Sequence, residues 1–142
     1  MTTNAARAAT LERALRASLE GDSSAIPGLY TDDVKAWAPA MSVASASELI
    51  AEFDKRDEAF SDIELEVAPL DVGGDYGCAE WSVTMTHSGR LVLDDGVIEA
   101  TGVRLTVYGV TVAEFRGERI CSLRQYWDEF AVLEQLGVLA RE

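Results

Sequence analysis

Three polar residues fall where their side chains could act on a bound molecule. Gln125 lies on the apolar face of a predicted strand, and a buried amide there needs hydrogen-bond partners that a substrate or a water molecule can supply. His87, the only histidine, ends another predicted strand, where its imidazole could transfer a proton at the mouth of a pocket. Asp54 follows Phe53 on a predicted helix, and burial there would raise the pKa of its carboxyl. We expect Asp54 or His87 to transfer the proton and Gln125 to orient the substrate or water.

Each of these residues also has a structural interpretation. Asp54 precedes Lys55 and Arg56, so it could be a solvated or salt-bridged carboxylate on the surface. His87 comes just before a turn and could be a rim residue, and Gln125 could satisfy its amide within the protein. The sequence leaves both interpretations open for all three residues.

The elements that must position these side chains follow from the hydrophobic periodicity. Apolar residues recur every three or four positions where we expect helices, and they alternate where we expect strands. The expected helices are at residues 4–20, 23–30, 45–60 and 129–136. The expected strands are at residues 34–39, 62–67, 76–87, 97–115 and 119–127.

This order of elements predicts the fold class. Hairpin-length connections between the long strands imply antiparallel pairing, and helices gathered on one face of such a sheet form an α+β architecture. We expect a single domain over residues 1–142, in which a curved, cone-shaped sheet, antiparallel or mixed, wraps onto three N-terminal helices. A pocket would lie between the two layers.

Strand alternation indicates which side chains share the concave face of the sheet. The residues expected to point inward are mostly apolar or aromatic: Trp81, Val83, Met85, Val107, Thr111, Leu123, Gln125 and Trp127. Tyr30 and Phe53, which precede the long strands, are further candidate ligand contacts. Such a lining suits a flat hydrophobic ligand.

Composition and charge exclude several classes of partner. The chain has 142 residues, with 25 acidic and 12 basic side chains and a net charge of −13. A surface that negative repels nucleic acid and anionic lipid, and no stretch approaches the ~20 apolar residues of a membrane span.

Cys78 and Cys121 are expected to be buried thiols, and no Cys or His pair has metal-ligand spacing, so we expect no metal. We find no targeting segment and expect a cytoplasmic protein.

Three groups of residues resemble motifs of one superfamily. Residues 20–22 (EGD) and 29–34 (LYTDDV) resemble its approach to the first strand, and residues 117–120 (GERI) resemble its last turn. Residues 124–128 (RQYWD) and 134–137 (EQLG) resemble its last strand and C-terminal helix. Over residues 5–137 the chain thus resembles the nuclear transport factor 2-like superfamily and, within it, the SnoaL-like polyketide cyclases. The resemblance implies a cystatin-like α+β barrel, but the fold hosts both enzymes and non-catalytic modules.

The catalytic residues of two related families are missing from this sequence. The resemblance to ketosteroid isomerases places Ala38 at their general base and Ala14 at their oxyanion-hole tyrosine. Limonene epoxide hydrolases use an arginine and two aspartates, and none of the matching positions, with Gln125 among them, has either residue type. SnoaL-like cyclases have a carboxylate at the position of Gln125. A three-residue shift would give that role to Asp128, whose structural alternative is to cap the closing helix.

Two functions therefore remain. The first is a SnoaL-like protein that binds a hydrophobic, polycyclic or terpenoid-like small molecule and isomerises, cyclises or hydrates it without a cofactor. The second is a non-catalytic ligand-binding or assembly module of the same fold. The resemblance also implies a homodimer through the outer sheet face, which has a less polar surface than a solvated face should have. The residues of that face are Tyr108, Val110, Val112, Arg124 and Tyr126.

Overall fold

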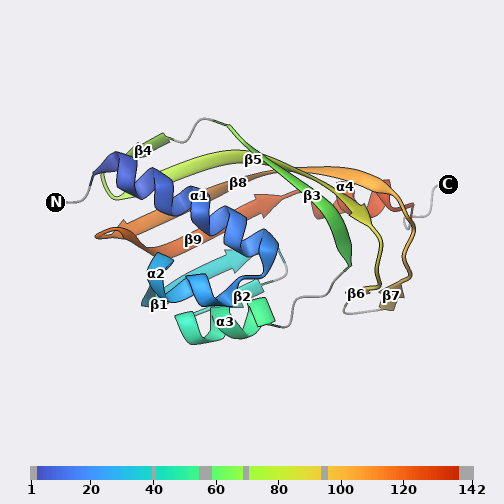
Figure 1. Cartoon of the computed structure of the whole chain (residues 1–142), viewed down its shortest axis with the longest axis horizontal. Helices are drawn as coiled ribbons and strands as arrows, with labels where there is room; N and C mark the ends of the chain where they lie inside the picture. The colour runs from blue at the N-terminus through green and yellow to red at the C-terminus, as the bar shows by residue number, and fades with distance from the viewer. Residues whose placement is uncertain (1–2, 40, 55–58, 69–70, 94–95, 138–142) are drawn as a thin grey trace.

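The structure, a computed structural model, describes residues 3–39, 41–54, 59–68, 71–93 and 96–137 of the chain (Figure 1). The helical segments are α1 (Asn4–Glu20), the 3₁₀ turn η1 (Ser23–Ala25), α2 (Ile26–Leu29), α3 (Ala46–Asp54) and α4 (Glu129–Gln135). The strands are β1 (Tyr30–Ala38), β2 (Met41–Val43), β3 (Phe60–Val67), β4 (Asp71–Gly73), β5 (Tyr76–His87), β6 (Leu91–Leu93), β7 (Gly96–Ile98), β8 (Arg104–Arg116) and β9 (Arg119–Trp127).

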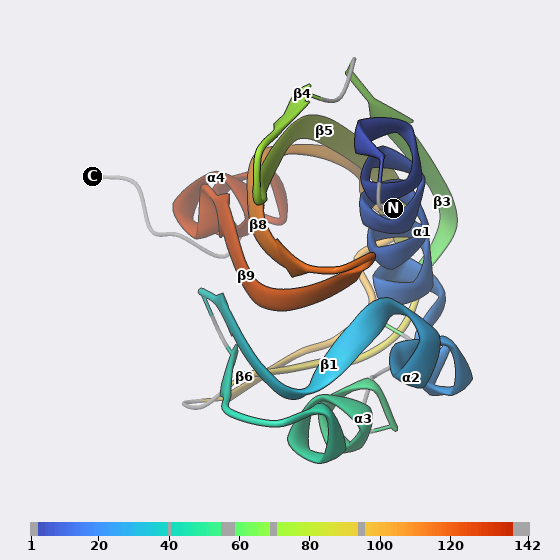
Figure 2. The same ribbon diagram turned by 90° about the vertical axis from the view of Figure 1, so that its left-hand side faces the viewer.

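One mixed sheet dominates the fold. Its strands follow the order β2-β1-β9-β8-β5-β3, and β4 pairs with β5 beside this path. Neighbouring strands are antiparallel except β1 and β9, which are parallel. Viewed end-on, β3, β5, β8 and β9 curve around α1 without closing into a barrel (Figure 2). The predicted α+β class, the curved mixed sheet and the N-terminal helices are confirmed.

Helix α1 is defined at both ends by its capping residues. The Thr3 side chain accepts a hydrogen bond from the backbone N–H of Ala6, as N-cap residues do. Gly21 ends the helix with φ 67°, and its N–H donates to the carbonyls of Ala17 and Ser18. Between these caps one apolar stripe of the helix, with Leu11 at its centre, is buried against the concave face of the sheet. The helix thereby forms one wall of the space that the sheet encloses.

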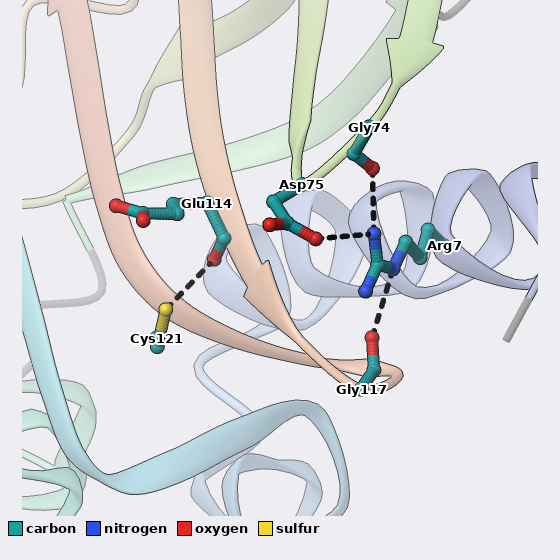
Figure 3. A network of polar contacts seen from close by, with 6 residues as sticks. All are labelled: Arg7, Gly74, Asp75, Glu114, Gly117 and Cys121. Carbon is teal, nitrogen blue, oxygen red and sulfur yellow. Dashed lines mark hydrogen bonds and ion pairs between the residues drawn. The ribbon is translucent and has the colours of Figure 1, made fainter.

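Arg7 fastens the start of α1 to the sheet (Figure 3). Its Nη1 donates to the carbonyl oxygen of Gly74 at 2.6 Å and to Oδ1 of Asp75 at 3.2 Å. Its Nε donates to the carbonyl oxygen of Gly117 at 2.8 Å, and the guanidinium lies 5.4 Å from the ring centroid of Phe115. The Arg7 side chain therefore ties the start of the helix to the β4–β5 and β8–β9 turns, so that the helix and the sheet are joined at this end of the molecule.

Several expected boundaries were wrong. Tyr30 begins β1 rather than ending a helix, and Phe60 begins β3, where it pairs with His87, rather than ending the third helix. Residues 55–58 of that expected helix lie outside the described residues. The expected strand at 97–115 is divided, because the chain around Gly102 (φ 72°) turns back to bond with His87. Its first part, β7, forms a separate hairpin with β6.

The two cysteines occupy different environments. Cys121 is half-buried and donates to the carbonyl oxygen of Glu114 (Figure 3), and burial raises the pKa of its thiol. Cys78 is exposed, contrary to expectation, because alternation along β5 turns Ala79 inward and Cys78 outward. No helix in the described part of the chain is long and apolar enough to cross a membrane.

Candidate functional site

A cavity of about 360 Å³ lies between the sheet and the second half of α1. Strands β3, β5, β8 and β9 form its concave wall, while β6 and α4, which lie at the same end of the molecule in Figure 1, form its edge. It is lined by Leu15, Ser18, Leu19, Phe60, Leu65, Trp81, Val83, Met85, Leu91, Val92, Leu93, Val107, Gln125, Trp127, Glu129 and Val132. The lining is thus mostly aliphatic and aromatic, as small-molecule sites are.

The predicted strand parity brings six candidate residues into this cavity. Trp81, Val83 and Met85 alternate along β5, and their side chains enter from one strand. Val107 enters from β8, and Gln125 and Trp127 enter from β9. Arg124 and Tyr126, which alternate with them along β9, are exposed on the other side of the sheet.

Trp81 is part of the cavity wall, and the absence of a side chain at Gly109 leaves space for its indole. A Cβ atom at Gly109 would lie 2.3 Å from Cζ2 of Trp81, which is far inside van der Waals contact. The indole therefore lies directly against the backbone of β8, where only glycine permits so close an approach. Its ring centroid is 6.3 Å from that of Trp127, with a 59° angle between the planes. The two indoles meet as a tilted aromatic pair within one lining.

A small polar network supports the aromatic wall. Oγ1 of Thr111, a fully buried residue, accepts a hydrogen bond from Nε1 of Trp81 at 2.9 Å and from Nε2 of Gln125 at 3.3 Å. The β5–β8–β9 ladder positions these groups, because Thr111 is directly opposite Gln125 in the register. Oε1 of Gln125 accepts no hydrogen bond from a described residue, so it can accept one from a bound molecule. Thr111 itself is predicted as a ligand contact but lies behind the lining.

Glu129 is the one ionisable residue of the lining in the described part of the chain, and the sequence analysis missed it. Its Oε2 accepts a hydrogen bond from Nε1 of Trp127 at 2.6 Å. Helix α4, which begins with Glu129, is held on β8 by Gln135, whose side chain bonds the backbone N–H and carbonyl of Thr106. Glu129 lies two residues beyond the inward Trp127, but it is the first residue of α4, where the alternation of β9 no longer applies.

His87 is buried completely and does not line the cavity. Its Nδ1 accepts a hydrogen bond from the backbone N–H of Thr101 at 3.2 Å and lies 2.9 Å from Oγ1 of the same residue. Its ring packs against Phe60, a lining residue, at 5.5 Å between centroids. The imidazole therefore holds the turn before β8 behind the wall, and it does not occupy the mouth of the cavity.

Asp54 and Asp128 also lie outside the lining. Asp54 is exposed at the last position of α3, a helix that packs on β1 and β2. Asp128 caps α4, because its Oδ1 accepts a hydrogen bond from the backbone N–H of Ala131 at 3.0 Å. The structure thus brings Gln125 alone, of the four polar candidates, into the cavity.

The remaining candidates belong to the hydrophobic core. Tyr30, Phe53 and Leu123 pack together with the main cluster of buried residues, not in the cavity lining. Burial raises the pKa of the Tyr30 hydroxyl, because the phenolate would lose its hydration. Among the described residues, no group of three or more His, Cys, Asp or Glu side chains could hold a metal ion.

Comparisons with known proteins agree with this arrangement. The sequence profile of the SnoaL-like domain family matches residues 11–123. The structure is similar to that of TsrD from Streptomyces laurentii, with a TM-score of 0.80 and 20% identity over 98% of this chain and 100% of that chain. A candidate polyketide cyclase from Acidithiobacillus ferrooxidans gives 0.80 and 22% over 99% and 100% of the two chains. AclR, a candidate hydroxylase from Streptomyces galilaeus, gives 0.77 and 22% over 99% and 86%. The search of curated proteins gave no match. At these identities the structural likeness shows the fold.

Proposed function

Since the chain belongs to the SnoaL-like domain family, we propose that it binds an apolar small molecule of polycyclic or terpenoid-like shape in its cavity. The observation that carries this proposal is the lining itself, with two indoles, aliphatic side chains and one partly buried amide around about 360 Å³. Sites for small organic molecules enclose about 300–1,000 Å³ and combine an apolar wall with a few placed polar groups.

Gln125 is the group that orients the ligand. Its Nε2 is held by Thr111, so the plane of the amide is fixed before a ligand arrives. Its Oε1 can then accept a hydrogen bond from a hydroxyl or amine of the ligand. A hydrogen bond in such an apolar setting gives selectivity, because a ligand without the matching group would leave the amide oxygen unpaired.

The reaction proposed for this site is an isomerisation, cyclisation or hydration. A rigid apolar cavity accelerates such steps by holding the reacting atoms of one molecule in a single geometry. Gln125 would orient the reacting group or a water molecule. The names of two structural neighbours, a candidate polyketide cyclase and a candidate hydroxylase, support an activity on small organic molecules.

A specific observation favours a second candidate function, a non-catalytic ligand-binding module. The two groups expected to move a proton, on Asp54 and His87, are not in the lining. The one ionisable group of the described lining, Glu129, is hydrogen-bonded to Trp127, and a cavity of this kind can bind a molecule without transforming it.

Native mass spectrometry of the protein from its host's extract tests both candidates. We expect a retained small molecule. After its release and incubation with fresh protein, we expect a product that liquid chromatography separates from it and that has the same elemental composition or that composition plus water. A retained molecule that never changes would select the binding module. A protein that retains nothing after repeated exposure to the extract would contradict ligand binding.

A further inference from the structure

The charges around the cavity are one-sided. In the described lining, Glu129 supplies a carboxylate, and no lysine, arginine or histidine is present to balance it. The whole chain has the same sign, with a net charge of −13. An apolar ligand with a carboxylate of its own would therefore enter with its charge unpaired and close to a like charge.

The position of Glu129 is fixed by an aromatic neighbour. Nε1 of Trp127 donates to its Oε2 at 2.6 Å, a short, charge-assisted hydrogen bond. This bond keeps the carboxylate beside the indole of Trp127, and the indole of Trp81 lies at 6.3 Å from that ring. Because an indole N–H lies in the plane of its ring, the carboxylate lies at the edge of the Trp127 indole. A carboxylate beside an aromatic lining can recognise an organic ammonium ion, through charge pairing with the carboxylate and cation–π attraction to an indole.

We infer that the ligand of this cavity is an apolar molecule carrying a protonated amine, which Glu129 and the Trp81–Trp127 pair bind at the cavity edge. The inference rests on the proposed binding of an apolar ligand and adds its charge class. The hydrophobic body would occupy the inner lining, with the ammonium group toward Glu129. The oxygen of Glu129 that Trp127 does not occupy would accept a hydrogen bond from the ammonium.

Calorimetric titration with three probes of one shape tests this assignment. Naphthylmethylamine, naphthylmethanol and naphthoate share an apolar body and are cationic, neutral and anionic at neutral pH. We expect the amine to bind about tenfold more tightly than the alcohol, from the combined cation–π and charge-pair contributions, and the acid to bind least. In Glu129→Gln the preference for the amine should fall to about threefold or less, the share left to cation–π attraction, while the affinity of the alcohol stays within about twofold of the wild-type value.

Glu118→Gln is the matched control, since Glu118 lies in the turn between β8 and β9 and the change in net charge is the same. It should retain the preference for the amine. Equal loss in both variants would assign the preference to the overall charge and overturn the assignment to Glu129. An alcohol that binds as tightly as the amine in the wild-type protein would overturn the inference alone. Failure of all three probes to bind would overturn the proposed function with it.

Discussion

Gly109→Ala tests the packing that keeps the cavity open. An alanine Cβ would lie 2.3 Å and 2.4 Å from Cζ2 and Cη2 of Trp81, and 2.7 Å from the backbone oxygen of Tyr126. Carbon atoms pack at about 3.5–4.0 Å, so the indole must move by about 1.2–1.7 Å. On the other side of the clash is the backbone of a strand, which yields less readily than a side chain. We therefore expect the indole to move toward the cavity.

The cost can be estimated from the contacts that change. Overpacking of this kind destabilises a core by about 1–3 kcal/mol. Displacement of Trp81 also breaks its hydrogen bond to Thr111, for about 1 kcal/mol more. We therefore expect Gly109→Ala to lower the free energy of unfolding by about 2–4 kcal/mol, or roughly 10 °C in Tm for a chain of this size. Affinity for an apolar ligand should fall as well, because the ring then occupies part of its space.

Urea and thermal denaturation measure the loss of stability. The near-ultraviolet circular dichroism of the native protein reports the displacement of the indole. Gly28→Ala is the matched control, since nothing lies within 4 Å of its Cβ position. That variant should be as stable as the wild type or slightly more stable, by up to about 1 kcal/mol. A Gly109→Ala protein within about 0.5 kcal/mol of the wild type, with an unchanged tryptophan spectrum, would refute the close packing of Trp81 on β8.

Three further predictions concern the network, the core and the outer face. Thr111→Val leaves two donors without their acceptor and should lower the free energy of unfolding, measured in urea, by about 2 kcal/mol. Thr111→Ser keeps the hydroxyl and should retain most of the wild-type stability. Equal stability of the two variants would contradict the network. Burial raises the pKa of Tyr30, so its contribution is complete below its ordinary value of 10.0 and is lost as pH rises above it. Tyr30→Phe should therefore flatten the alkaline fall in stability, and an unchanged fall would count against burial as its cause. The homodimer through the outer face remains a prediction, and Tyr108 is 74% exposed on that face. In sedimentation experiments, Tyr108→Lys should convert the dimer into a monomer. A wild-type protein that sediments as a monomer at micromolar concentration would exclude the homodimer.

The wall of the cavity could be predicted because strand alternation is a local property. Once β5 and β9 were placed, their period of two assigned Trp81 and Trp127 to the concave face, and the structure confirms both. The hydrogen-bond partner of Gln125 is harder to predict from the sequence, because it depends on the register between β8 and β9, which places Thr111 opposite Gln125.

The edge of the cavity could not be predicted in the same way. Glu129 begins a helix, and helical periodicity gives no reason to continue the strand alternation onto its first residue. The β6–β7 hairpin is short and pairs only with itself, so nothing in its spacing separates it from a loop. His87 was misplaced because a strand end is commonly a rim, whereas here the turn at Thr101 covers the imidazole. These features are set by long-range contacts rather than by local pattern.

The most direct test of ligand binding uses the three tryptophans as reporters. Trp81 and Trp127 line the cavity, whereas Trp37 packs against Tyr126 on the outer face, at 5.2 Å between ring centroids. We would titrate the ¹⁵N-labelled protein with naphthylmethanol and follow the three indole N–H resonances, assigned with single Trp→Phe variants. Saturable shifts of the Trp81 and Trp127 resonances, with that of Trp37 unchanged, would confirm that the cavity binds an apolar molecule. Shifts of Trp37 alone, or of none of the three, would contradict it.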